Sequence, residues 1–134
     1  MALGENELYR SADVDPFPRI KPVHQYPSKC GAVASAPLLA VGTPMAFETD
    51  NDQWVVWSNG GTVTGAASIR GFIYPEAVQI DASDEVLGII MVAGEIHYDD
   101  IVLPSGEVEA DLKAELQANL RARGLYVTGL EEVR

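Results

Sequence analysis

The chain has 134 residues, a length typical of one domain with a single core. Its formal net charge of −11 at pH 7 disfavours binding to phosphate backbones, so we expect no nucleic-acid partner. No apolar run approaches the roughly 20 residues of a membrane span, and no stretch resembles a signal peptide, so we expect a soluble protein with no membrane partner. Cys30 is the only cysteine, which excludes an internal disulfide.

Charge and proline are both distributed unevenly along the chain. Residues 1–44 contain four acidic and four basic residues, whereas residues 45–134 contain sixteen acidic and five basic ones. Six of the eight prolines also fall in the first 44 residues. Because proline fixes its own φ and has no N–H to donate, this segment is predicted to be neither helix nor interior strand. We therefore predict an extended arm over residues 1–43 and a folded domain over residues 44–134.

The arm contains more apolar residues than a purely solvated linker needs, among them Phe17, Ile20 and Tyr26. Two interpretations follow. The arm is a disordered tail, or it becomes ordered on a partner by laying an extended strand along a sheet edge, with these three residues as anchors.

The folded domain is predicted to begin with a β-hairpin. Residues 45–48 and 53–57 have strand composition and flank a cluster of turn formers at residues 49–52. Trp54 and Trp57 should point to opposite faces of the second strand. Two indoles that point apart do not form one sugar-stacking platform, so we favour core or subunit packing for both.

Short strands are predicted next. Residues 69–74 form a strand that ends with Tyr74 before a proline, and residues 86–92 form an apolar strand buried on both faces. The acidic residues 81–85 lack the spacing and central glycine of a calcium loop, which indicates a solvated turn. Several short strands separated by Gly and Pro turns indicate a small barrel or sandwich.

The stretch from residue 94 to residue 104 is predicted to contain two short strand pieces joined at an acidic bend, Asp99–Asp100. His97 lies beside this bend and suggests a metal site or an acid–base pair. The chain has only two histidines, however, and a metal site needs three or four convergent ligands. We therefore expect a solvated strand end whose carboxylates cap nearby N–H groups, with no metal and no cofactor.

The period changes to that of a helix after Pro104. Ser105 is a candidate N-cap, and Val108, Leu112, Leu116 and Leu120 share one face, so we predict an amphipathic helix over residues 106–123. Gly124 should end this helix, and residues 125–128 should form a closing strand. The predicted fold class is α+β and mostly β: a small barrel or sandwich with one C-terminal amphipathic helix and a closing strand, preceded by an extended N-terminal arm.

Three pieces of the domain match one family pattern. They are Thr43-Pro44-Met45 before the first hairpin, the Val56-Trp57 strand end with its Gly-rich turn, and the stretch from residue 96 to residue 104. An acidic helix start and a terminal strand of small and β-branched residues follow these three and belong to the same pattern. The Tyr-acid-Asp-aliphatic core at Tyr98–Ile101 is the most specific piece. Over residues 42–130 the chain resembles the lambda-type head decoration proteins, or capsid cement proteins, of tailed bacteriophages.

This resemblance implies a homotrimer on the outer surface of the virion capsid, made in the host cytoplasm. It would bind the bacteriophage head after expansion and hold neighbouring copies of the major capsid protein together, partly through strand addition by its N-terminal arm. We assign capsid binding to Tyr9, Arg10, Phe17, Arg19, Ile20 and Tyr26, and trimer or core packing to Trp54, Trp57, Tyr74 and Tyr98. This mechanism requires an arm that does not fold back into its own body.

The proposed role is structural stabilisation of the capsid, with no enzymatic step. Two alternatives remain open at this point. The chain is a virion-displayed ligand- or sugar-binding β module with an exposed indole, or it is a hydrolase that uses His97 with Asp99 or Asp100.

Overall fold

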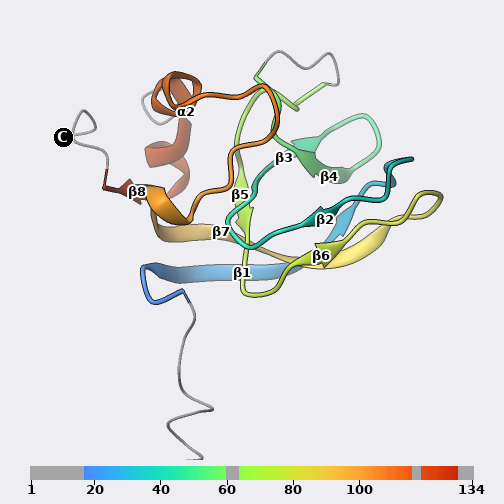
Figure 1. The fold of residues 1–134 in the computed structure, drawn as a ribbon, viewed down its shortest axis with the longest axis horizontal. Coiled ribbons are helices and arrows are strands. Elements are labelled where there is room, and N and C mark those ends of the chain that lie inside the picture. Colours follow the sequence, from blue (N-terminus) through green and yellow to red (C-terminus); the bar gives the residue numbers. More distant parts are fainter. Residues whose placement is uncertain (1–16, 60–63, 116–118, 130–134) are drawn as a thin grey trace, which may run out of the picture.

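The structure, a computed structural model, describes residues 17–59, 64–115 and 119–129 (Figure 1). In this part of the chain β-strands predominate and one α-helix lies close to the C-terminus. The strands are β1 (Ile20–Cys30), β2 (Leu38–Leu39), β3 (Pro44–Glu48), β4 (Gln53–Val56), β5 (Gly71–Ile73), β6 (Val78–Gln79), β7 (Val86–His97) and β8 (Leu125–Thr128). The helical elements are the 3₁₀ turns η1 (Tyr98–Asp100) and η3 (Arg121–Arg123) and the α-helix α2 (Glu109–Glu115).

Six strands form one mixed sheet in the order β1-β4-β3-β5-β7-β8, and β1 also pairs with β7. This second pairing closes five of the strands into a small barrel. The seam between β1 and β4 is a single parallel bridge between Cys30 and Trp54. Strands β2 and β6 form a separate two-stranded sheet. The mostly β fold with one helix is therefore confirmed.

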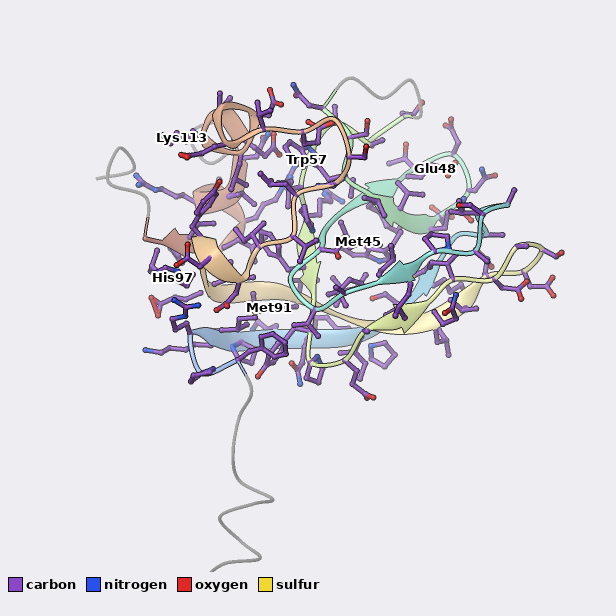
Figure 2. All side chains as sticks on the ribbon, in the orientation of Figure 1. Met45, Glu48, Trp57, Met91, His97 and Lys113 are labelled. Carbon is purple, nitrogen blue, oxygen red and sulfur yellow. The ribbon has the colours of Figure 1, made fainter. Side chains whose placement is uncertain are left out.

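Strand β7 is the centre of the body. Along one side it pairs antiparallel with β1 over nearly its whole length, and along the other it pairs with β5 and then in parallel with β8. Its adjacent residues Ile90 and Met91 are both fully buried and belong to two different apolar clusters. Figure 2 shows Met91, Met45 and Trp57 inside the body, with Lys113 and His97 toward its periphery. The prediction of burial on both faces holds for the middle of β7 only, because Leu87 is exposed.

The prediction of an extended arm over residues 1–43 is wrong for residues 20–43. Strand β1 belongs to the sheet, and its first residue, Ile20, is buried in the core. The prolines were misleading because β1 has β7 on one side and, in the described part of the chain, no strand on the other until Cys30. Pro22 and Pro27 therefore lie on an edge strand, the one place in a sheet where a missing N–H is tolerated.

The helix begins later than predicted, at Glu109 instead of residue 106. Pro104 to Glu107 form a turn instead, with the Glu107 N–H donating to the Pro104 carbonyl and Gly106 at a φ of +89°. A positive φ at the third position is what a type II turn requires. The first helical turn is fixed by Asp111, whose carboxylate accepts the Val108 N–H at 3.1 Å. Ser105 therefore does not cap the helix.

The face predicted to be apolar is buried at Leu112 and Leu120, but Val108 is exposed and Leu116 lies outside the described residues. Gly124 adopts the left-handed conformation and ends η3, as predicted. The closing strand is confirmed as β8. No helix in the described ranges is both long enough and apolar enough to span a membrane.

The buried leucine of the C-terminal segment gives a stability prediction. Leu120→Ala should lower the free energy of unfolding by about 2–4 kcal/mol, because it removes buried methyl groups and leaves a cavity in the core. The matched control is Leu38→Ala, since Leu38 is largely exposed on β2 and should change stability by less than about 0.5 kcal/mol. Urea denaturation followed by tryptophan fluorescence measures both. Equal losses would contradict the assignment of Leu120 to the core.

Candidate functional site

The end of β7 carries the residues that most invited a chemical interpretation. The strand stops at His97, and the chain turns through η1 before running on without regular structure from Ile101. His97 Nδ1 accepts the Asp99 N–H at 3.1 Å, and the Ile101 N–H donates to the Tyr98 carbonyl at 3.0 Å. The predicted second strand piece is thus absent from the described structure. The expected capping occurs, but the imidazole provides it instead of a carboxylate.

The two aspartates of η1 are held by Arg19, which comes from the turn before β1. Arg19 Nη2 donates to Asp100 Oδ1 at 3.0 Å, and Nη1 lies 3.6 Å from Asp99 Oδ2. The second oxygen of Asp100, Oδ2, is buried and has no hydrogen-bond partner among the described residues. Because Arg19 is about half exposed, solvent screens these contacts, and each contributes less than about 1 kcal/mol. Their effect is geometric: they fasten the chain just before β1 to the end of β7.

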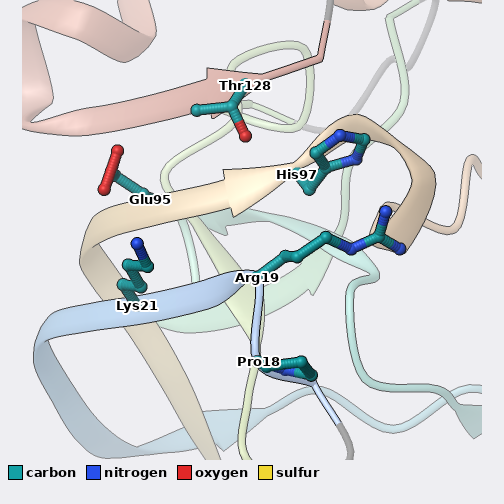
Figure 3. Close-up of a pocket in the computed structure, with 6 residues that line it drawn as sticks. All are labelled: Pro18, Arg19, Lys21, Glu95, His97 and Thr128. Atoms are coloured by element: carbon teal, nitrogen blue, oxygen red, sulfur yellow. The ribbon is translucent and has the colours of Figure 1, made fainter.

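A shallow hollow of about 160 Å³ lies beside this cluster. Figure 3 shows the side chains that line it, which come from β1, β7, β8 and the turn before β1. They are Pro18, Arg19, Lys21, Glu95, His97 and Thr128. Lys21 and Glu95 are direct partners in the β1–β7 register, so opposite charges face each other across the hollow. The lining is therefore of mixed charge and favours neither an anion nor a cation.

The hollow lacks the arrangement that a hydrolase or metal site needs. His97 Nδ1 already accepts a backbone N–H, and both nearby aspartates face the Arg19 guanidinium. No group of three or more His, Cys, Asp or Glu side chains in the described ranges is placed to hold a metal ion. The geometry supports a structural role for the His97–Asp99–Asp100 stretch.

The residues predicted to bind the capsid fall into three groups. Tyr9 and Arg10 lie outside the described residues. Ile20 is buried in the larger apolar cluster, so its prediction as a docking anchor is wrong. Phe17 packs against that cluster and is partly buried, so its capsid contact stays a prediction. Both are apolar residues close to the first registered pair of β1 with β7, and the core takes them up.

Tyr26 alone among the predicted apolar anchors is free on the surface, with 52% of its area exposed. Its ring stacks on His24, with centroids 6.1 Å apart and planes inclined by 13°. Arg19, the charged residue of the same set, is engaged with η1 as described. The predicted site is therefore divided between the core, an ion-pair cluster and an exposed aromatic pair.

The residues predicted to pack in a core or a trimer interface lie mainly in the core. Trp57 is only 1% exposed, and its indole N–H donates to the Ala67 carbonyl at 3.1 Å. Trp54 is half-buried on the opposite face of the hairpin, and its ring lies edge-on to that of Phe47, with the ring centroids 5.5 Å apart. Tyr74 and Tyr98 are partly buried against the larger cluster. Core packing is confirmed for Trp57, while a trimer contact by the others stays a prediction.

Sequence reasoning missed two buried carboxylates. Glu115 accepts the Ile69 N–H at 2.6 Å and an Asn119 side-chain N–H at 3.1 Å, and Arg123 donates to the Ile69 carbonyl at 2.6 Å. Desolvation, with a smaller contribution from nearby Arg70, lowers the pKa of Arg123. These bonds attach the C-terminal helical segment to the chain before β5. The sequence did contain a signal for the burial of Glu115, since Glu115 follows Leu112 by three residues and so shares its buried helix face.

The second missed carboxylate, Glu48, stabilises the hairpin turn. It is buried and accepts side-chain N–H groups of Asn51 at 2.6 Å and Gln53 at 2.7 Å. Asp81 acts similarly in the acidic turn before β7, where the N–H groups of Ser83 and Asp84 donate to its carboxylate and lower its pKa. The interpretation of this segment as a solvated turn is therefore supported.

A comparison of the sequence with models of known protein families found no match, and a search of curated proteins found none either.

Cys30 gives a prediction about pH. Burial raises the pKa of its thiol, outweighing the opposing hydrogen bond from the Gly88 backbone, because desolvation disfavours the thiolate. A raised native pKa means that its contribution to stability is complete below the ordinary thiol pKa of about 8.5 and is lost as the pH rises through the native value. The free energy of unfolding should therefore fall as the pH rises above about 8.5, and this fall should be smaller in Cys30→Ala.

Thiol titration of the native protein provides the direct check. A thiol-specific reagent at pH 8 should react with Cys30 at least about a hundredfold more slowly in the native protein than in urea, because only a thiolate reacts and it must be accessible. A rapid native reaction would show that Cys30 is not buried as described.

Proposed function

We propose that this chain is a capsid decoration protein that binds the outer surface of an expanded bacteriophage head as a homotrimer and clamps neighbouring copies of the major capsid protein. The proposal rests first on the resemblance of residues 42–130 to the lambda-type decoration family. The observation that carries it is the ion-pair cluster in which Arg19 binds Asp99 and Asp100. The most specific piece of the resemblance, Tyr98–Ile101, thus fixes the point at which residues 1–16 join the body.

The pieces that carry the resemblance also form one structural unit. The Val102 N–H donates to the Gly42 carbonyl at 3.0 Å, and the Trp57 N–H donates to the Pro44 carbonyl at 3.0 Å. Gly42 has a φ of +94°, and a Cβ there would overlap the Asp100 carbonyl oxygen, so only glycine fits. Segments some 60 residues apart in the sequence therefore depend on each other, which supports reading them as one pattern rather than as separate chance matches.

The fold corrects the length of the capsid-binding arm. Because β1 is part of the barrel, we confine the arm to residues 1–16, named here the leader, with Tyr9 and Arg10 as its remaining assigned contacts. The body cannot supply residues 20–30 for strand addition without opening its own sheet. In a trimer three leaders act together, so a modest affinity for each becomes tight clamping through effective concentration.

The described residues favour a role in assembly over the alternatives. No nucleophile with an activating base and an orienting group is assembled in the described ranges, and clamping needs none. The sugar-binding alternative required an exposed indole platform. Trp57 is buried and Trp54 packs against Phe47 on the other face, so the two indoles do not form one.

Deletion of residues 2–16 tests the proposal. The shortened protein should keep the fold of the full chain, because the described core begins at Phe17, and should keep its oligomeric state. It should lose binding to cognate expanded heads, measured as occupancy by cryo-electron microscopy. The matched control is a full-length chain whose residues 2–16 are scrambled. A shortened protein that occupies heads fully would contradict the role of the leader, and a full chain that never binds expanded heads would overturn the proposed function.

A further inference from the structure

The first residues of β7 have a free edge. Strand β1 pairs with them on one side, but on the other side β5 reaches only as far as Ile90 in register. Among the described residues no strand pairs with Val86–Gly88 on that side. The last backbone hydrogen bond on that side is the one in which the Tyr74 N–H donates to the Ile89 carbonyl at 3.3 Å, and beyond it β6 approaches β7 through Val78 and Gly88.

The backbone of Leu87 points to this free edge. In an antiparallel strand the N–H and C=O of successive residues point alternately to the two sides. Since the Ile89 carbonyl points toward β5, away from β1, the N–H and C=O of Leu87 point the same way, where β5 no longer runs. A strand laid there would find one donor and one acceptor in ladder geometry.

A hollow of about 280 Å³ lies at this edge, between β6 and β7. It is lined by Glu76, Ala77, Val78, Gln79, Leu87, Gly88 and Ile89. The Leu87 side chain is 71% exposed beside it. Gly88 lets Val78 approach closely, since a Cβ at Gly88 would lie 2.6 Å from Val78 Cγ2, so the hollow depends on this glycine. The Gln79 amide is engaged with the Ala36 carbonyl at 2.9 Å, which leaves Glu76 as the polar side chain free to meet a ligand.

The free edge along β1 is protected against pairing, and the edge at Val86–Ile89 is not. Along β1 the free edge carries Pro22 and Pro27, together with Lys21 and Lys29, which are the residue types that discourage strand addition. The edge at Val86–Ile89 carries no proline and no charge. An unprotected edge beside a hollow that is bordered by an exposed leucine is a geometry that accepts an added strand.

Charge selects the occupant. Glu76 lies in the lining, and Asp84 and Glu85 immediately precede β7, whereas Lys29 is the one cation paired with this stretch, opposite Leu87. The chain's own leader is a poor fit, since residues 1–16 contain four acidic residues and one basic residue.

We infer that the edge of β7 at Val86–Ile89 binds an extended segment of another protein, with an apolar side chain against Leu87 and Lys or Arg side chains near Glu76 and Glu85. The added segment would pair with the Leu87 backbone and extend the sheet beyond the end of β5. This inference goes beyond the proposed function, because it concerns the opposite end of β7 from the leader and holds whatever the leader binds.

Titration of the ¹⁵N-labelled full chain with synthetic peptides tests this inference. The probe is a capped seven-residue peptide that alternates valine and lysine, and its charge-reversed counterpart alternates valine and glutamate. The valine–lysine peptide should shift the amide resonances of residues 76–79 and 85–89, and the valine–glutamate peptide should not. Raising the salt concentration from 50 mM to 500 mM should weaken the binding several-fold, because the charges involved are exposed.

Two variants and a matched control localise the site. Leu87→Lys and Glu76→Lys should each weaken binding of the valine–lysine peptide at least about tenfold, because each places a cation at the edge. Val23→Lys is the control, since Val23 is 70% exposed but lies on the protected β1 edge, and it should bind as the parent does. The dispersion of the amide spectrum shows whether each variant is folded. If Leu87→Lys does not fold, Glu76→Lys still tests the inference.

Three results would overturn the inference. They are shifts confined to β1, equal binding of the two peptides, and self-association of the chain that Leu87→Lys abolishes while no peptide binds, which would make a second copy the occupant. The proposed function is tested separately, by binding of the leader deletion to capsids. Failure of this inference and failure of the proposed function are therefore distinguishable.

Discussion

The antiparallel pairing of β1 with β7 is the contact on which the rest of the structure depends. Strand β7 separates the two apolar clusters, since Ile90 belongs to one and Met91 to the other. Strand β1 covers one side of β7 and, through the bridge from Cys30 to Trp54, closes the barrel. Removal of β1 would expose an edge along β7, the longest strand in the described part of the chain. Residues 20–30 are therefore needed for folding, while most of their side chains stay exposed along the outer edge of β1.

Local signals predicted the local elements well. The hairpin of β3 and β4 follows from two apolar runs around a turn, and β8 follows from a β-branched stretch after Gly124. The assignment of faces in β4 was also correct, because Val55 and Trp57 meet one cluster while Trp54 and Val56 meet the other. Strand alternation alone fixes such an arrangement.

Features set by distant contacts could not be predicted in the same way. Nothing within residues 20–30 reveals that β7 lies alongside them, so prolines that are tolerated on an edge strand looked like strand breakers. The bond from the Ile69 N–H to Glu115 links positions 46 apart, and the contact of Arg19 with Asp100 links positions 81 apart. The acidic bend beside His97 was predicted at the end of a strand, but the contact of its two aspartates with Arg19 was not.

The two ends of β7 have different surroundings, and this difference bears on how the protein would act in an assembly. One end lies beside Arg19 and the base of the leader, and the other carries the unprotected edge at Leu87. Twelve residues of strand span at most roughly 40 Å, so the two contact regions are separated by much of the width of the body. A protein that holds neighbouring subunits together needs two contact points that one subunit cannot occupy at once. A rigid strand buried along its middle keeps two such points at a fixed distance. A force applied at one point would therefore be transmitted to the other through the core and not through a flexible linker.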